Sequence, residues 1–147
     1  MNFLAWLEQT SLAIWVGESL YGYPFLLGMH VVGLSIIVGL TTITNLRLLN
    51  VIGELTSNSL VVLLKIAWIG FAINSISGLA LFSSQATYFI TSTPFLSKIA
   101  LISCGVVSAA FIQHRLAIGA TVSKYLAFVS LLFWLGAIVA GRLIAYL

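Results

Sequence analysis

The sequence contains no aspartate, one cysteine and two prolines, and charged residues make up only 6% of its 147 positions. Soluble domains usually carry about 25% charged residues, so a soluble fold of this composition would expose large apolar patches. Cys104 has no second cysteine with which to form an intrachain disulfide, and one cysteine with two histidines offers no zinc-finger spacing. The composition therefore excludes an ordinary soluble domain.

Several classes of functional motif are also missing. No aspartate is present to orient a histidine, no nucleophile elbow surrounds a serine, and no pair of carboxylates lies inside a hydrophobic run. No Gly-rich phosphate-binding loop occurs, which argues against nucleotide-driven transport. The six basic residues are scattered, so the net charge of +3 is no sign of nucleic-acid binding. No residue is assigned a catalytic role, and whether the chain is an enzyme stays open.

Hydrophobic residues make up 61% of the chain and are grouped in four long runs. A helix needs about 20 apolar residues to cross the hydrocarbon core of a membrane. The runs cover approximately residues 24–46, 60–82, 95–113 and 124–146. We therefore predict an all-α fold, an integral membrane four-helix bundle, in which residues 1–147 form a single transmembrane domain.

The N-terminal residues 2–16 are apolar but are interrupted by a polar stretch that begins at Glu8. Trp6 and Trp15 are of the aromatic type that is favoured at the boundary between lipid and water. This pattern predicts an interfacial amphipathic helix that lies on the membrane surface. The segment has no basic start and no clear cleavage site, so we expect it to be retained and not removed as a signal peptide.

The basic residues indicate an orientation in the membrane. The larger group, at one end of the predicted spans, is Arg47, Lys65, Arg115 and Lys124, and the smaller group, at the other end, is Lys98 and Arg142. The positive-inside rule places the larger group in the cytoplasm. We expect a multi-pass protein of the bacterial inner membrane with both termini in the periplasm.

Ionisable residues inside membrane spans are costly, which makes each of them a candidate functional residue. His30 lies about 9 Å along the first span and Lys98 about 5 Å along the third, at a helical rise of 1.5 Å per residue. Both positions are near the outer side, where Glu18 and Arg142 are also expected. The sequence therefore predicts a polar cluster near the outer leaflet.

The other histidine, His114, is predicted to lie elsewhere. It falls about 28 Å along the third span, so it differs from His30 in depth by roughly 19 Å. The two axial ligands of one haem lie at comparable depth, which excludes a pairing of these two histidines within one chain. A basic side chain at the end of a helix also fits a simple topology anchor, and the role of His114 stays open.

The outer cluster has the composition of a haem site. A neutral imidazole is a common ligand of haem iron, which makes His30 the candidate metal ligand. Gly33 lies one turn further along, where a missing side chain would let a flat macrocycle lie against the helix. Lys98 and Arg142 would neutralise the propionates, and Lys98 is an alternative axial ligand. Two other interpretations stay open: a structural hydrogen bond from His30 with Lys98 extending to the interface, and a proton or ion pathway.

Small residues recur at four-residue spacing on the later spans, which lets membrane helices approach closely. These residues are Gly70 and Gly78 with Asn74 between them, then Gly105 and Ala109, then Gly136 and Ala140. The amide of Asn74 needs a partner in the membrane, and an interhelical hydrogen bond is expected. Such faces also support assembly into a homo-oligomer of undetermined number or into a larger membrane complex.

Several motifs carry a resemblance to a known family. They are Glu18-Ser19-Leu20-Tyr21-Gly22-Tyr23-Pro24, then His30, Gly33, Gly39 and Asn45-Leu46-Arg47-Leu48-Leu49, then Trp68-Ile69-Gly70-Phe71, Gly78-Leu79 and Pro94-Phe95-Leu96-Ser97-Lys98. Over most of its length the chain resembles an uncharacterised family of small four-span bacterial inner-membrane proteins.

A more distant resemblance is to the membrane protoporphyrinogen oxidase family and to the copper-resistance D-type four-helix membrane proteins. The shared features are a histidine early in the first span, a later Gly and Arg-Leu, and a lysine that opens the third span. In the oxidase family the histidine and the lysine are functional and haem association has been proposed, which implies such roles for His30 and Lys98. Asn45 stands where the closer family favours aspartate. The oxidase activity itself is not implied.

We therefore expect a membrane protein that binds haem b or another porphyrin through His30, Lys98, Gly33 and Arg142, and that serves as an electron-transfer module. The alternative is a non-catalytic membrane protein that assembles through its small-residue faces. Its surroundings in either case are the lipid bilayer.

Overall fold

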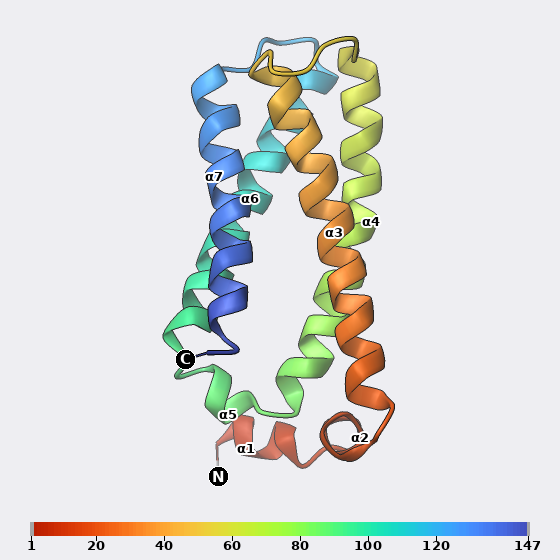
Figure 1. Cartoon of the computed structure of the whole chain (residues 1–147), viewed down its shortest axis with the longest axis vertical. Coiled ribbons are helices and arrows are strands. Elements are labelled where there is room, and N and C mark those ends of the chain that lie inside the picture. The colour runs from red at the N-terminus through yellow and green to blue at the C-terminus, as the bar shows by residue number, and fades with distance from the viewer. Residues whose placement is uncertain (1, 147) are drawn as a thin grey trace.

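A computed structural model describes residues 2–146 of the chain. These residues form seven helices and no strand: α1 (Phe3–Glu8), α2 (Ser11–Glu18), α3 (Gly22–Leu48), α4 (Ser57–Ser83), α5 (Ala86–Phe89), α6 (Thr93–Ala117) and α7 (Lys124–Leu143). Figure 1 shows the long helices α3, α4, α6 and α7 side by side, with the short helices α1, α2 and α5 at one end of the bundle. The predicted all-α fold class is confirmed.

The four long helices are long and apolar enough to cross a membrane. Their mean hydropathy reaches 1.9 to 2.0 over 18 residues, and at most 28% of those residues are buried inside the bundle. The 27 residues of α3 correspond to about 40 Å and the 20 residues of α7 to about 30 Å at 1.5 Å per residue. Because the outward side chains are apolar, lipid is the solvent that suits them, and the chain is a multi-pass membrane protein.

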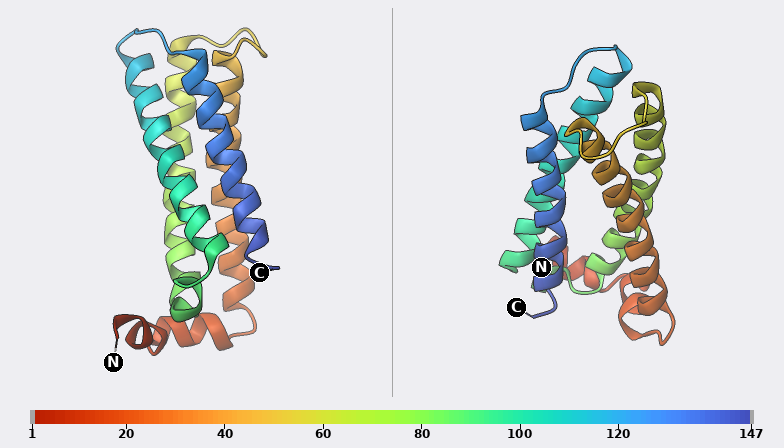
Figure 2. Two further views of the ribbon diagram at one scale, coloured as in Figure 1. Left: turned by 90° about the vertical axis from the view of Figure 1, so that its left-hand side faces the viewer. Right: turned by 45° about the horizontal axis from the view of Figure 1, so that its top comes forward.

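The long helices are arranged as two hairpins. α3 packs closely against α4, and α6 packs against α7, with fewer contacts between the two pairs. Both ends of the chain lie at the end of the bundle that also carries α1, α2 and α5, which we call the terminal end (Figures 1 and 2). The opposite end carries the α3–α4 and α6–α7 connections, and we call it the loop end.

Glycines bring α3 and α4 into backbone contact. A Cβ atom at Gly33 would lie 2.5 Å from the backbone nitrogen of Asn74, and one at Gly70 would lie 2.6 Å from Cβ of Ile36. Both distances are shorter than any side chain tolerates. The predicted role of small residues in close helix packing is confirmed for this pair of helices.

The second hairpin closes around a tryptophan. Trp134 on α7 is 1% exposed and packs with Ile37, Ala67 and Ala109 in the middle of the bundle. A Cβ atom at Gly105 on α6 would lie 2.9 Å from its ring, so the glycine makes room for the indole. The indole Nε1–H has no hydrogen-bond partner in the described part of the chain.

Toward the loop end, polar side chains tie the two hairpins together. The hydroxyl of Ser108 on α6 donates to Ser130 on α7 at 2.8 Å, and the amide of Asn45 on α3 lies 3.4 Å from the same oxygen. Trp68 on α4 donates from Nε1 to Gln113 on α6 at 2.6 Å. The Asn45–Ser130 and Trp68–Gln113 contacts join the two hairpins, whereas the Ser108–Ser130 bond joins the two helices of the second hairpin. All three are directional, which apolar packing alone is not.

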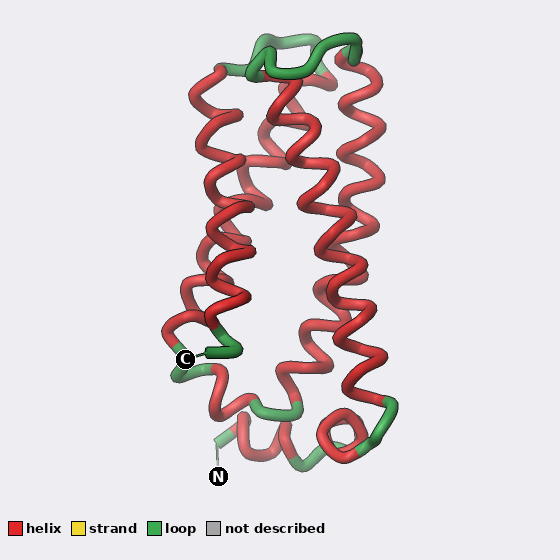
Figure 3. Tube along the Cα trace, in the orientation of Figure 1, coloured by secondary structure: helices red, strands yellow, loops and turns green. Residues whose placement is uncertain are grey.

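The N-terminal segment differs from the single helix predicted over residues 2–16. It forms two short helices, because Thr10 interrupts the first one and its hydroxyl accepts from the backbone nitrogen of Ala13 to cap the second. Figure 3 shows the loop between them, and both helices lie across the terminal end of the bundle. Their location at a membrane surface stays a prediction.

Capping residues also move the boundaries of the long helices. α4 and α6 begin at Ser57 and Thr93, a few residues before the predicted positions, because Thr56 and Ser92 cap them. α3 and α6 likewise extend beyond 46 and 113, to Leu48 and Ala117. α7 ends at Leu143, and residues 144–146 of the predicted fourth span form a turn. The connection after α4, predicted to be a loop, contains the short helix α5.

Candidate functional site

His30 and Asn74 hold each other through two reciprocal hydrogen bonds between α3 and α4. The ring nitrogen Nδ1 of His30 donates to the backbone carbonyl of Asn74 at 3.0 Å. The side-chain amide of Asn74 donates to the backbone carbonyl of His30 at 2.9 Å. The close backbone approach at Gly33, one turn along α3, makes this geometry reachable. The ring is half-buried and points toward α4, not toward lipid.

These contacts decide which ring nitrogen carries the hydrogen. A carbonyl oxygen only accepts, so Nδ1 is the protonated nitrogen and Nε2 carries the lone pair when the ring is neutral. The hydroxyl of Ser77 lies 3.3 Å from Nδ1 and donates to the carbonyl of Ile73, so it adds a second acceptor beside Nδ1. Metal-binding histidines commonly donate their other N–H to a backbone carbonyl in this way.

Lys98 on α6 faces the free nitrogen of the imidazole. Its Nζ lies 3.3 Å from Nε2 of His30, within hydrogen-bond distance. Gly78 leaves room for the ring, because a Cβ there would lie 3.0 Å from Cε1 of His30. Gly141 on α7 lies beside Lys98, where a Cβ would be in ordinary contact with Nζ at 3.5 Å. The site thus joins α3, α4, α6 and α7 at the terminal half of the bundle.

The charge of this pair has no acidic partner among residues 2–146, which the structure describes. The long helices contain no acidic residue, and the three glutamates, at positions 8, 18 and 54, lie outside them. Two unit charges about 4 Å apart repel by roughly 4 kcal/mol at an effective dielectric constant of about 20, so His30 and Lys98 are not both charged. With Lys98 as the cation, its ammonium donates to Nε2 of a neutral His30.

The structure brings two of the four predicted binding residues, His30 and Lys98, within hydrogen-bond distance of each other. Gly33 does not offer a face to a macrocycle, because the backbone of α4 covers it. Arg142 is exposed and donates to the hydroxyl of Tyr146 at 3.0 Å, and no hydrogen bond joins it or Glu18 to the pair in the described residues. His114 lies in the last turn of α6, at the loop end, apart from His30 as its sequence position requires.

Sequence reasoning did not assign Ser77, Gly78 and Gly141 to this site. The first two follow Asn74 by three and four residues, so they share its helix face, and this spacing was the available signal. Asn74 itself was expected to hydrogen-bond another helix, and that expectation is confirmed. Gly141 has no sequence signal, because its contact with Lys98 depends on how α6 packs against α7.

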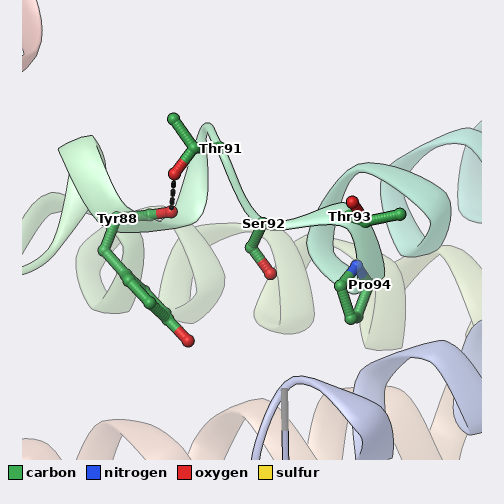
Figure 4. Close-up of a pocket in the computed structure, with 5 residues that line it drawn as sticks. All are labelled: Tyr88, Thr91, Ser92, Thr93 and Pro94. Carbon is green, nitrogen blue, oxygen red and sulfur yellow. Dashed lines mark hydrogen bonds between the residues drawn. The ribbon is translucent and has the colours of Figure 1, made fainter.

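Two surface hollows lie away from the pair. One, of about 330 Å³, is lined by residues of the connection between α4 and α6, namely Tyr88, Thr91, Ser92, Thr93 and Pro94. Figure 4 shows their side chains around the turn before α6, with Thr91 donating to the carbonyl of Tyr88. The other, of about 360 Å³, is lined by Leu55, Asn58, Ser59, Val62 and Leu63 at the start of α4. Neither includes His30 or Lys98.

The donor set fits a metalloporphyrin better than a bare metal ion. Among the described residues, no group of three His, Cys, Asp or Glu side chains is placed to hold a metal. A porphyrin supplies four nitrogen ligands of its own and needs one or two axial ligands from the protein. His30 meets that need through Nε2, provided that Lys98 moves aside. Lys98 supplies positive charge for a carboxylated ligand.

No family model, curated protein or solved structure matches this chain. The resemblances drawn from the motifs around His30 and Lys98 therefore stay predictions.

Proposed function

We propose that the protein binds haem b or a related porphyrin in the membrane and serves as an electron-transfer module. The observation that supports this proposal is the fixed orientation of His30. Its Nδ1–H is bound to the carbonyl of Asn74, and its Nε2 lone pair faces the interior between the hairpins. An imidazole held in this way is ready to ligate a metal without rearrangement of its ring.

In this proposal each residue of the site has a separate role in binding the haem. His30 provides the axial nitrogen, and Asn74 and Ser77 hold its ring and tautomer. Lys98 provides the charge that a propionate needs in a low-dielectric site. The apolar layer around Trp134 separates the site from the loop end. Bound haem would supply one-electron redox chemistry, and its potential would depend on this burial and on the axial ligand.

The cellular setting belongs to the same proposal. We place the protein in the bacterial inner membrane, as a homo-oligomer or a subunit of a larger complex. The loop end carries Arg47 and Arg115, which bond the carbonyls of Leu55 and Thr121 in its connections. The positive-inside rule assigns this end to the cytoplasm and both termini to the periplasm.

The test is the visible absorption spectrum of the protein purified in detergent after haem-replete expression. The oxidised protein is expected to show a Soret band, and reduction with dithionite is expected to sharpen its visible bands. His30→Ala removes the imidazole nitrogen that we propose as the axial ligand and should abolish the bound haem. His114→Ala is the matched control, because it removes the other histidine at the opposite end of the bundle and should leave the spectrum unchanged.

A colourless wild-type protein that does not take up added hemin contradicts the proposal. A Soret band that survives in His30→Ala and disappears in His114→Ala contradicts the assignment of the ligand. A colourless protein that assembles into a stable oligomer would favour the alternative function, assembly through the small-residue faces.

A further inference from the structure

Lys98 covers the one nitrogen of His30 that is able to bind a ligand. Nδ1 is engaged by Asn74 and Ser77, while Nε2 faces the Nζ atom of Lys98, at 3.3 Å. The side-chain amide nitrogen of Asn74 also lies 3.4 Å from Nε2, but it is equally far from Nδ1 and donates to the backbone carbonyl of His30 at 2.9 Å. A metal on Nε2 would need the space that this amine occupies. Binding at His30 therefore requires that Lys98 leave the imidazole.

The amine of Lys98 has only a weak hydrogen-bond acceptor in Nε2 of His30. A neutral imidazole nitrogen accepts a hydrogen bond but carries no charge to balance an ammonium. No acidic residue lies in the four long helices, and none is bonded to Lys98 in the described residues. A cation inside a membrane protein is normally balanced by an opposite charge, because its transfer from water is costly. An incoming carboxylate offers Lys98 a stronger partner than His30 does.

The packing around Lys98 permits its amine to leave His30 and to bind a carboxylate instead. Its side chain is half-buried and lies against Gly141, where α7 presents no side chain. The four-carbon stem of a lysine is flexible, so the amine moves without a shift of the backbone. The ring of His30 stays in place during such a movement, because its two anchors are on α4 and not on α6.

We propose that Lys98 makes the site selective for ligands that carry carboxylates. It masks Nε2 of His30 until the carboxylate of an incoming porphyrin draws the ammonium away. A porphyrin without free carboxylates has to displace Lys98 and leave its charge unbalanced. This inference rests on the proposed function and names the class of ligand that the same site accepts.

The experiment compares hemin, which has two free propionates, with hemin dimethyl ester, which has none. Each is titrated into apo-protein in lipid nanodiscs, and binding is followed by the Soret band. His30→Ala gives the baseline for partition of each compound into lipid. Above that baseline, the wild type is expected to bind hemin at least about tenfold more tightly than the ester, which corresponds to 1.4 kcal/mol or more.

Lys98→Met keeps an unbranched side chain that is one atom shorter, and it removes the amine that faces Nε2 together with its charge. In this variant Nε2 is unmasked and no ammonium is left to balance, so the preference for hemin should disappear and the ester should bind more tightly than it does to the wild type. Lys98→Gln serves as a second neutral variant, and Lys98→Arg should keep the preference. Lys65→Met is the matched control: it removes a lysine near the loop end of α4 and should behave as the wild type.

Equal binding of both compounds to the wild type overturns the inference, as does a preference that persists in both neutral variants. In these cases the Soret band is still present and still depends on His30, so the proposed function stands. If neither compound gives a Soret band above the His30→Ala baseline, the proposed function and this inference fail together.

Discussion

At the scale of single residues, the site depends on glycines as much as on the residues that carry its chemistry. Gly33 lets the backbones of α3 and α4 approach so closely that His30 reaches the carbonyl of Asn74. Gly78 leaves space for the imidazole, because a Cβ there would lie 3.0 Å from Cε1 of His30. The orientation of His30 therefore follows from missing side chains on its own helix, α3, and on α4.

Gly33→Ala tests this dependence. Its new Cβ would lie 2.5 Å from the nitrogen of Asn74 and 2.7 Å from the oxygen of Gly70, both backbone atoms that yield only if the helices separate. We expect a loss of about 1–3 kcal/mol in the free energy of unfolding, the usual cost of overpacking. The measurement is reversible unfolding in mixed micelles with increasing SDS.

Gly39→Ala is the control on the same helix, because nothing lies within 4 Å of the added Cβ. Alanine is the better helix former, so this variant should be as stable as the wild type or slightly more so. A Gly33→Ala protein as stable as Gly39→Ala would contradict the role of Gly33.

The residues of the site were predictable to different degrees. His30 and Lys98 stand out because an ionisable group in an apolar span is rare, and their similar depth follows from the helical rise. The direction in which each side chain points depends on helix rotation, which the sequence does not determine here because the spans are apolar on all faces. For that reason the sequence did not show that the backbone of α4 covers Gly33, or that Arg142 donates to Tyr146.

At the scale of elements, the short helices of the terminal end are joined by a carboxylate. Glu8, at the end of α1, accepts from the backbone nitrogen of Thr87 on α5 at 2.8 Å and from its hydroxyl at 2.7 Å. These two donors hold the pKa of Glu8 below its ordinary value of 4.5. The bond links the N-terminal segment to the connection between the two hairpins.

This link is expected to depend on pH. Because the pKa of Glu8 is lowered by the contact, the stabilisation is present at pH 7 and is lost as the pH falls below 4.5 and through the lowered value. At pH 7, Glu8→Gln should release α1 and raise hydrogen exchange in residues 3–8 several-fold. In the wild type, acidification through the lowered pKa of Glu8 should have the same effect after correction for intrinsic exchange rates.

Glu18→Gln is the matched control, since no hydrogen bond joins Glu18 to another helix in the described residues. If α1 exchanges equally in the wild type and in Glu8→Gln at pH 7, the contact does not hold the helix in place.

The long apolar helices were predictable from the sequence, whereas the short helices of mixed polarity were less so. Each of the four long helices includes nearly all of its predicted span, because 20 or more apolar residues have one arrangement that satisfies the backbone in lipid. The N-terminal segment is too short and too mixed for that constraint. In that segment the hydroxyl of Thr10 caps the second helix, so the single helix that was expected is divided into α1 and α2.

At the scale of the whole molecule, the two ends of the bundle differ in chemistry. The loop end holds basic residues bonded to its own connections, while the terminal end holds both chain ends, the short helices and the nearby His30–Lys98 pair. A ligand that enters from the terminal end therefore meets the pair without crossing the apolar layer around Trp134.

The proposed orientation is testable with reporters. Alkaline phosphatase is active only in the periplasm, and green fluorescent protein fluoresces mainly in the cytoplasm. Fusions of phosphatase to either end of the chain should be active, whereas a fluorescent insertion in the loop at residues 49–56 should fluoresce. The reverse pattern would place the His30–Lys98 pair near the cytoplasm and contradict the proposed orientation.

The most direct test of the account is the nitrogen-15 spectrum of histidine-labelled protein in nanodiscs, recorded before and after addition of hemin. Before addition, we predict that the His30 resonances, assigned with His30→Ala, show a protonated Nδ1 and an unprotonated Nε2. After addition, the paramagnetic iron should broaden the His30 signals beyond detection and leave those of His114 in place. His30 signals that are unchanged by hemin, or a loss of the His114 signals instead, would contradict the central claim that His30 is the ligand.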